Sequence, residues 1–164
     1  MCYLNILLIE KRLLALSKVR MPGQSLTIKG QFDQIATLSD LVDHFAEEVG
    51  FDERDRYALQ LAVCEALENI IIHGYQGESS NLIEARVRTD PGELCIELWD
   101  DAPPFNPANG PIEVSWTEDD PPVGGLGLRI IHKVMDEINY ERQGHRNWLC
   151  MLKRLQTLAN KSGE

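Results

Sequence analysis

An acidic and an amide side chain stand one helical turn apart in a strongly apolar part of the sequence. Glu65 and Asn69 lie within LQLAVCEALENIIIH, whose apolar residues recur at helical spacing. At about 100° per residue, Glu65, Asn69 and His73 form a second stripe along the edge of the apolar face. An amide oxygen there can bind a magnesium ion beside a carboxylate base, because Mg²⁺ takes few protein ligands. The alternative is the polar border of an ordinary amphipathic helix.

A second candidate carboxylate, Asp100, ends a segment of alternating polar and apolar residues. Leu94, Ile96 and Leu98 point to one face of the predicted strand. Asp100 shares that face by the two-residue period. A carboxylate there is costly to bury unless a partner satisfies it, and an exocyclic amine such as that of adenine is one such partner. The alternative is an aspartate that caps the turn before the prolines that follow.

A glycine-rich sequence, GGLGL at residues 124–128, runs directly into a predicted helix. Glycine lets the backbone approach a phosphate closely, and a helix N-terminus offers free N–H groups and a favourable dipole. The segment does not match the P-loop pattern, because no Gly-Lys-Ser/Thr sequence follows. It therefore predicts either a phosphate-binding turn or a simple hinge.

Apolar periodicity predicts the elements that position these residues. Strands are predicted at 24–29, 81–89, 93–100, 137–142 and 147–154, and helices at 33–49, from Asp52 or Asp55 to near Gly74, and at 124–135. The proline-rich segment 102–123 lacks periodicity, which predicts a long functional loop. Few crossover helices separate the strands, which favours a mixed, mainly antiparallel sheet with the helices on one face. The predicted fold is a two-layer α/β sandwich rather than a Rossmann fold.

Length and charge restrict the class of protein. A chain of 164 residues suits one domain, and 43% hydrophobic with 26% charged residues is ordinary for a globular protein. The net charge of −10 argues against direct binding to nucleic acid and against an anionic membrane surface. The cysteines form no CxxC pair, so we expect buried thiols in a reducing compartment rather than a disulfide or zinc framework. They are Cys2, Cys64, Cys95 and Cys150.

The N-terminal segment is open to three interpretations. Its apolar run, Leu4–Ile9, is too short to span a membrane, and its charges are not placed as in a signal peptide. The segment is a short helix, an appendage to an interface, or translated sequence upstream of a start at Met21. We therefore expect an extension at residues 1–22, a domain at 23–155 and a tail at 156–164.

The order of these motifs is more specific than any one of them. CEALENIIIHGYQ is followed by DDAPPFNP and then by GGLGLRIIHKVMDEINYERQGHRNWLCMLKR. From Leu26 to Lys153 the chain resembles the histidine-kinase-like (GHKL) ATPase superfamily, and within it the anti-sigma-factor serine kinases. The resemblance implies a Bergerat-type ATP-binding fold in a cytoplasmic homodimer.

The resemblance also implies a role for each candidate residue. Glu65 matches the general base, Asn69 the magnesium ligand, and Asp100 the aspartate that binds adenine. Further positions that would contact the nucleotide lie in the two glycine-box segments and are Ala102, Gly124, Gly125, Gly127 and Leu128. Residues 102–123 match the ATP lid.

The function implied is that of a protein-serine kinase that uses ATP and Mg²⁺. It would phosphorylate an anti-anti-sigma (STAS-type) protein and sequester a sigma factor, with Glu65 polarising the serine hydroxyl of the partner. The alternative is a non-catalytic switch, in which ATP gates the choice of partner or only protein binding is retained. An ATP-driven clamp, as in gyrase or chaperone relatives, would need transducer domains that we do not expect from this sequence.

Two positions depart from the family pattern. Ala102 stands where the first glycine box usually has glycine, and Asn106 where relatives often have aspartate. If residue 102 needed a positive φ, or lay against the adenine ring, its methyl group would weaken binding. We expect nucleotide binding to survive. We expect His73, His132 and His145 to be polar or packing positions, because nothing pairs them with a second ligand or base.

Overall fold

The computed structural model describes residues 23–110 and 125–156 of the chain. The elements are β1 (Gly23–Lys29), α2 (Phe32–Val49), α3 (Glu53–Glu68), η1 (Asn69–Gly74), β2 (Leu82–Asp90), β3 (Glu93–Asp100), η2 (Pro107–Asn109), α4 (Leu126–Val134), β4 (Glu137–Gln143) and β5 (Arg146–Arg154). The predicted N-terminal extension, most of the predicted lid and nearly all of the C-terminal tail lie outside the described residues. The predicted domain limits therefore remain predictions.

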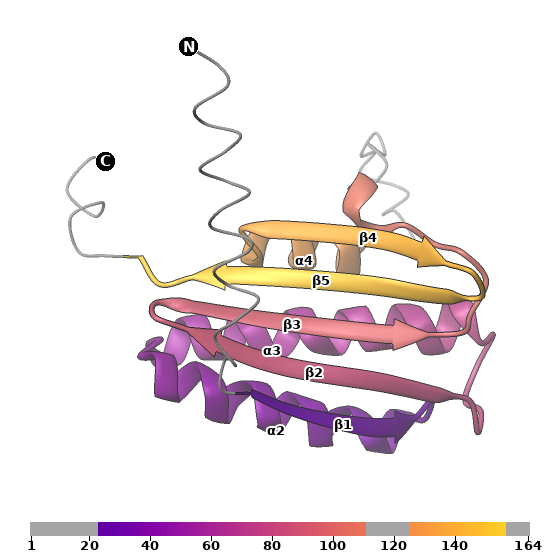
Figure 1. Cartoon of the computed structure of the whole chain (residues 1–164), viewed down its shortest axis with the longest axis horizontal. Coiled ribbons are helices and arrows are strands. Elements are labelled where there is room, and N and C mark those ends of the chain that lie inside the picture. The colour runs from indigo at the N-terminus through magenta and orange to yellow at the C-terminus, as the bar shows by residue number, and fades with distance from the viewer. Residues whose placement is uncertain (1–22, 111–124, 157–164) are drawn as a thin grey trace, which may run out of the picture.

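The strands form one sheet in the order β1-β2-β3-β5-β4, and every pairing in it is antiparallel. β2 turns into β3 through Pro91 and Gly92, and β4 turns into β5 through Gly144 and His145. Helices α2, α3 and α4 all lie on one face of this sheet (Figure 1). The predicted two-layer α/β sandwich is thereby confirmed.

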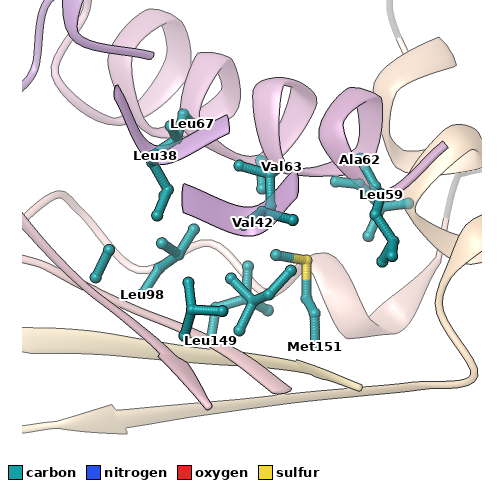
Figure 2. Close-up of a cluster of buried hydrophobic side chains, with 14 of the residues drawn as sticks. Leu38, Val42, Leu59, Ala62, Val63, Leu67, Leu98, Leu149 and Met151 are labelled. Carbon is teal, nitrogen blue, oxygen red and sulfur yellow. The ribbon is translucent and has the colours of Figure 1, made fainter. Parts of the chain in front are cut away.

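The core lies between the helices and the inner face of the sheet (Figure 2). Apolar residues recur at helical spacing in α2 and α3 and at alternate positions in the strands, so each element presents one apolar face to the others. Fully buried members include Leu38, Val42, Leu59, Val63, Ile83, Ile96, Leu98, Ile131 and Met151. This shared core holds α3 and α4 side by side above the central strands.

The helix ends follow the predicted signals, and one alternative is resolved. Asp52 is the N-cap of α3, because its carboxylate accepts a hydrogen bond from the backbone N–H of Asp55 at 2.9 Å. Gly50 ends α2 at a φ of 100°, in the left-handed region that favours glycine. At Asn69 the second helix changes to π geometry, which often marks a functional position. Within residues 23–110 and 125–156, no helix is both long and apolar enough to cross a membrane.

Candidate functional site

A pocket lies between η1 and one end of the central strands. It is lined by Asn69 and Gly74 of η1, by Asp100 at the end of β3 and Ala102 after it, and by Asn147 of β5, among others. Residues predicted from two separate motifs therefore meet in one place: Asn69 from the first, and Asp100 and Ala102 from the second. The free volume is about 30 Å³, which holds one or two water molecules.

Asn69 begins η1 and carries a buried amide. Its Nδ2 is buried and has no hydrogen-bond partner among the residues that the structure describes. Leaving such a group unpaired costs about 1–3 kcal/mol, so the site favours a bound group that satisfies it. A half-turn about the last side-chain bond exchanges the amide nitrogen and oxygen. The oxygen is a suitable Mg²⁺ ligand, so Asn69 fits the role expected of it.

Glu65, one turn before Asn69, lies against the first turn of α4 rather than in the pocket lining. A Cβ built on Gly127 would overlap Oε2 of Glu65 and come within 3.3 Å of its Cδ. Glycine at position 127 therefore allows the carboxylate to reach the start of α4. Burial, followed by the negative charge of Glu68, raises the pKa of Glu65 above its ordinary value. A raised pKa brings a carboxylate closer to the range of an effective general base at neutral pH.

The start of α4 has the features of an anion-binding turn. Gly125 is the N-cap and has a φ of 83°, a conformation that other residues rarely adopt. The first N–H groups of any helix, here including those of Gly127 and Leu128, lack intrahelical acceptors. The side chain of Leu128 packs partly buried against the core, which leaves its backbone for contact with a ligand. Gly124 lies outside the described residues.

Asp100 is held in one orientation by two donors. It is only 5% exposed, and its Oδ1 accepts from the backbone N–H of Ala102 at 2.8 Å and from Nδ2 of Asn147 at 2.7 Å. Burial raises the pKa of Asp100, and the hydrogen bond from Asn147 opposes that rise. Because Oδ1 already accepts twice, Oδ2 is the oxygen suited to an exocyclic amine.

Asn147 holds Asp100 and Ala102 in place at this end of the pocket, and the sequence analysis did not predict this role. Its Nδ2 also donates to the carbonyl of Ala102 at 3.0 Å, while its Oδ1 accepts from the Tyr140 hydroxyl at 2.7 Å and from Nη1 of Arg142 at 2.8 Å. Arg142 donates to the same Ala102 carbonyl at 2.7 Å. The sequence did contain one indication of this role. Asn147 shares the inner face of its strand with the buried Leu149, and a polar side chain on a buried face needs hydrogen-bond partners.

Ala102 is accommodated because Gly74 has no side chain. Among the described residues other than glycine, positive φ is recorded at Gln76, so Ala102 keeps an ordinary backbone conformation. A Cβ built on Gly74 would lie 2.6 Å from the Cβ of Ala102, which itself is 3% exposed. The methyl group thus fills the space that a side chain at position 74 would need. The objection to Ala102 based on positive φ does not apply.

Gly74→Ala should lower the free energy of unfolding by about 1–3 kcal/mol, because two methyl groups would then overlap in a packed region. Ala102→Gly in the same chain should recover most of that loss. Urea unfolding of both single variants and the double variant measures the coupling between the positions. Strictly additive effects would show that the two residues do not share this space.

The segment after Ala102 is tied to α4. Nε2 of His132 makes a 2.7 Å hydrogen bond with the carbonyl oxygen of Pro107. The side chain of Asn106 accepts from the backbone N–H of Ala108 at 2.9 Å and caps η2, which an aspartate would do equally well. The structure therefore gives His132 the packing role expected of it.

The sequence is similar to a known domain family and to several named proteins. The histidine kinase-like ATPase domain model matches residues 28–153. The chain is 27% identical over 113 residues to a serine/threonine-protein kinase, BtrW, of Bordetella bronchiseptica, covering 67% of this chain and 78% of that protein. It is 29% identical over 121 residues to the serine-protein kinase RsbW of Halalkalibacterium halodurans, with coverages of 69% and 72%. It is 27% identical over 97 residues to an anti-sigma F factor of Clostridium botulinum, with coverages of 58% and 68%.

A solved structure of the RsbU and RsbW domains of a Mycobacterium tuberculosis protein is similar in fold, with a TM-score of 0.56 at 18% sequence identity. The match covers 82% of this chain and 32% of that one, so this chain spans about a third of the solved one. The family model covers well over half of the sequence and includes every candidate residue from Glu65 to Leu128. The chain belongs to the histidine kinase-like ATPase domain family.

Proposed function

We propose that this protein is a protein-serine kinase that uses Mg²⁺ and ATP, phosphorylates an anti-anti-sigma (STAS-type) partner and sequesters a sigma factor. The observation that carries the proposal is the unpaired buried amide of Asn69, with Glu65 one turn before it and Asp100 across the pocket. The relatives named serine-protein kinase and anti-sigma F factor support the choice of partners.

In this proposal, the two ends of the site bind different parts of ATP. At the pocket end, Oδ2 of Asp100 accepts from the exocyclic amine of adenine. At the α4 end, the free N–H groups of Gly127 and Leu128 receive phosphate oxygens. Asn69, which lines the pocket one turn after Glu65, would hold Mg²⁺ through its amide oxygen. The bound metal supplies positive charge that neutralises the phosphates.

Glu65 is the proposed general base. Its carboxylate would orient the serine hydroxyl of the partner protein and accept its proton as the oxygen attacks the γ-phosphate. The contact between Glu65 and Gly127 supports this role, because it puts the base at the end of the site where the phosphates would lie. Most of the rate enhancement in such a transfer comes from positioning and from neutralisation of charge.

The proposed partners agree with the charge of the chain. A net charge of −10 favours association with a basic protein surface, although charge speeds association more than it selects a partner. We extend the proposal to a cytoplasmic homodimer, because the serine kinases that the sequence resembles commonly dimerise.

Calorimetric titration of Mg-ATP and Mg-ADP into the purified protein tests the nucleotide site. We expect binding that depends on magnesium, and we expect Asn69→Ala to weaken it by about tenfold or more, equivalent to about 1.4 kcal/mol. Asn139→Ala is the matched control, because Asn139 is exposed on β4. If wild-type protein binds no nucleotide at millimolar concentration, the kinase proposal is wrong and the chain is a partner-binding module with an ATPase fold.

A further inference from the structure

Two cysteines touch on the face of the sheet opposite the helices. The sulfur atoms of Cys95 on β3 and Cys150 on β5 lie 3.3 Å apart, and both cysteines are free thiols. In the strand register Cys95 faces Leu152 and Glu97 faces Cys150, so the thiols are diagonal neighbours. Their neighbours in sequence, including Ile96 and Met151, point the other way into the core.

The surroundings distinguish the two thiols. Nη2 of Arg88 lies 3.5 Å from the sulfur of Cys95, and Nε of Arg88 pairs with the Glu97 carboxylate at 2.7 Å. The hydrogen bond from Cys150, together with the charge of Arg88, lowers the pKa of Cys95 despite its burial. The same hydrogen bond and burial raise the pKa of Cys150. Arg88 lies beside the sulfur of Cys95 and favours its negatively charged form, so we assign the first attack on an oxidant to Cys95.

We propose that Cys95 and Cys150 are a modification site at which a peroxide forms a reversible disulfide. The Cys95 thiolate attacks one oxygen of hydrogen peroxide, the O–O bond breaks, and a sulfenic acid forms while hydroxide leaves as water after protonation. The Cys150 sulfur then attacks the Cys95 sulfur, and its proton leaves with the displaced hydroxide as a second water. Overall, the two thiols are oxidised to a disulfide and one peroxide is reduced to two waters.

Formation of the bond requires the two sulfur atoms, and locally the two strands, to approach one another. A disulfide bond is about 2.05 Å long, so the sulfurs at 3.3 Å have to approach by about 1.2 Å. Diagonal neighbours on antiparallel strands stand about 7–8 Å apart, and the Cα atoms of a disulfide usually lie about 4.4–6.8 Å apart. β3 and β5 therefore have to draw together locally at this point. In a reducing compartment such a bond would be transient, as redox-sensing disulfides are.

The bond would also have a structural consequence. It would close a loop that includes η2, α4 and β4, and would so restrict the unfolded chain. It would join β3, which ends at Asp100, to β5, which contains Asn147. The oxidised protein should therefore resist thermal unfolding more than the reduced protein does.

Peptide mass spectrometry after non-reducing digestion tests the proposal on the full chain. After treatment with hydrogen peroxide we expect a peptide that links Cys95 to Cys150 and is lighter by two hydrogens than the separate thiol peptides. The melting temperature should rise by several degrees and return on addition of dithiothreitol. The double variant Cys2→Ser/Cys64→Ser should behave like wild type, whereas Cys95→Ser and Cys150→Ser should each lose the linked peptide and the rise in Tm.

Several results would overturn the proposal. The first is that Cys95 and Cys150 stay reduced at peroxide concentrations that oxidise Cys64. The second is that one of these two residues forms its disulfide with Cys2 or Cys64 instead. A reversible rise in melting temperature that persists in Cys150→Ser would also overturn it. If Cys95→Ser fails to fold because its side chain is buried, the half-buried Cys150→Ser decides the question.

Discussion

Replacement of Glu65 by glutamine should slow phosphate transfer to a STAS-type partner by about 10²–10⁴-fold, the usual contribution of a general base. Glutamine keeps the size of the side chain and its place against Gly127, but it cannot accept the proton of a serine hydroxyl. Affinity for Mg-ATP should change little, because in the proposed site Asp100, Asn69 and the first turn of α4 hold the nucleotide. Initial rates of transfer of labelled γ-phosphate, beside calorimetric affinities, separate the two effects.

The pH dependence of transfer gives a second measure of the same role. Because the base must be deprotonated, the wild-type rate should fall as the pH decreases through the raised pKa of Glu65. Glu65→Gln should lose that dependence. Glu53→Gln is the matched control, since Glu53 is exposed in the first turn of the same helix. A Glu65→Gln protein with the wild-type rate would exclude Glu65 as the base.

Asn147→Asp should lower the free energy of unfolding at neutral pH by about 1–3 kcal/mol, because the donor between two buried side chains is lost. The change replaces the Nδ2 donor, 2.7 Å from the Asp100 carboxylate, with a second carboxylate oxygen. Two carboxylates at that distance have to share a proton, so the pKa of one of them rises strongly. Arg142, which contacts Oδ1 of Asn147, would offset part of the repulsion.

The sign of the pH effect follows from the raised pKa. Between the unfolded and folded pKa values the folded variant binds more protons than its unfolded chain does. The stability that the shared proton contributes is therefore fully present below the pKa of an unfolded aspartate, about 3.9. It is lost as the pH rises through the raised pKa of the folded carboxylate pair. Urea unfolding at about pH 5 and about pH 8 should show a larger deficit against wild type at the higher pH.

Asn139→Asp is the matched control for this charge. Asn139 is exposed on β4, so a new carboxylate there stays in water and has an ordinary environment. Its stability should follow that of wild type at both pH values. If the deficit of Asn147→Asp is the same at both pH values, the two carboxylates do not share a proton, and the contact between Asn147 and Asp100 has been misjudged.

Local features of the sequence predicted most of the elements correctly. The end of α2 at Gly50 and the alternation before Asp100 depend on neighbours within a few residues, so they could be predicted without the fold. The choice of Asp52 over Asp55 as the N-cap of α3 came from the structure. The change to π geometry at Asn69 could not be predicted. The apolar residues of NIIIHG satisfy a helical period in either geometry, and only packing in the folded protein selects one.

In the candidate site, too, some features follow from neighbouring residues in the sequence and others from packing in the folded protein. Glu65 and Asn69 lie one turn apart on a single helix, so their proximity was determined by sequence spacing. The contact of Glu65 with Gly127 depends on how α3 packs against α4. The fit of Ala102 against Gly74 depends on where the end of β3 meets η1. Ala102, which departs from the family pattern, is therefore compatible with the fold because Gly74 leaves room for its methyl group. The family pattern says nothing about this contact.

The sequence by itself determined which residues have the chemistry: a carboxylate and an amide on one helix, an aspartate after an apolar strand, and glycines before a helix. The tertiary structure alone decided that Asn147 orients Asp100 and that Cys95 touches Cys150. Both contacts join β3 to β5, which lie side by side although α4 and β4 separate them in the chain. Pairings of this kind are set by burial of a shared core, and no local pattern specifies which distant strand becomes the neighbour.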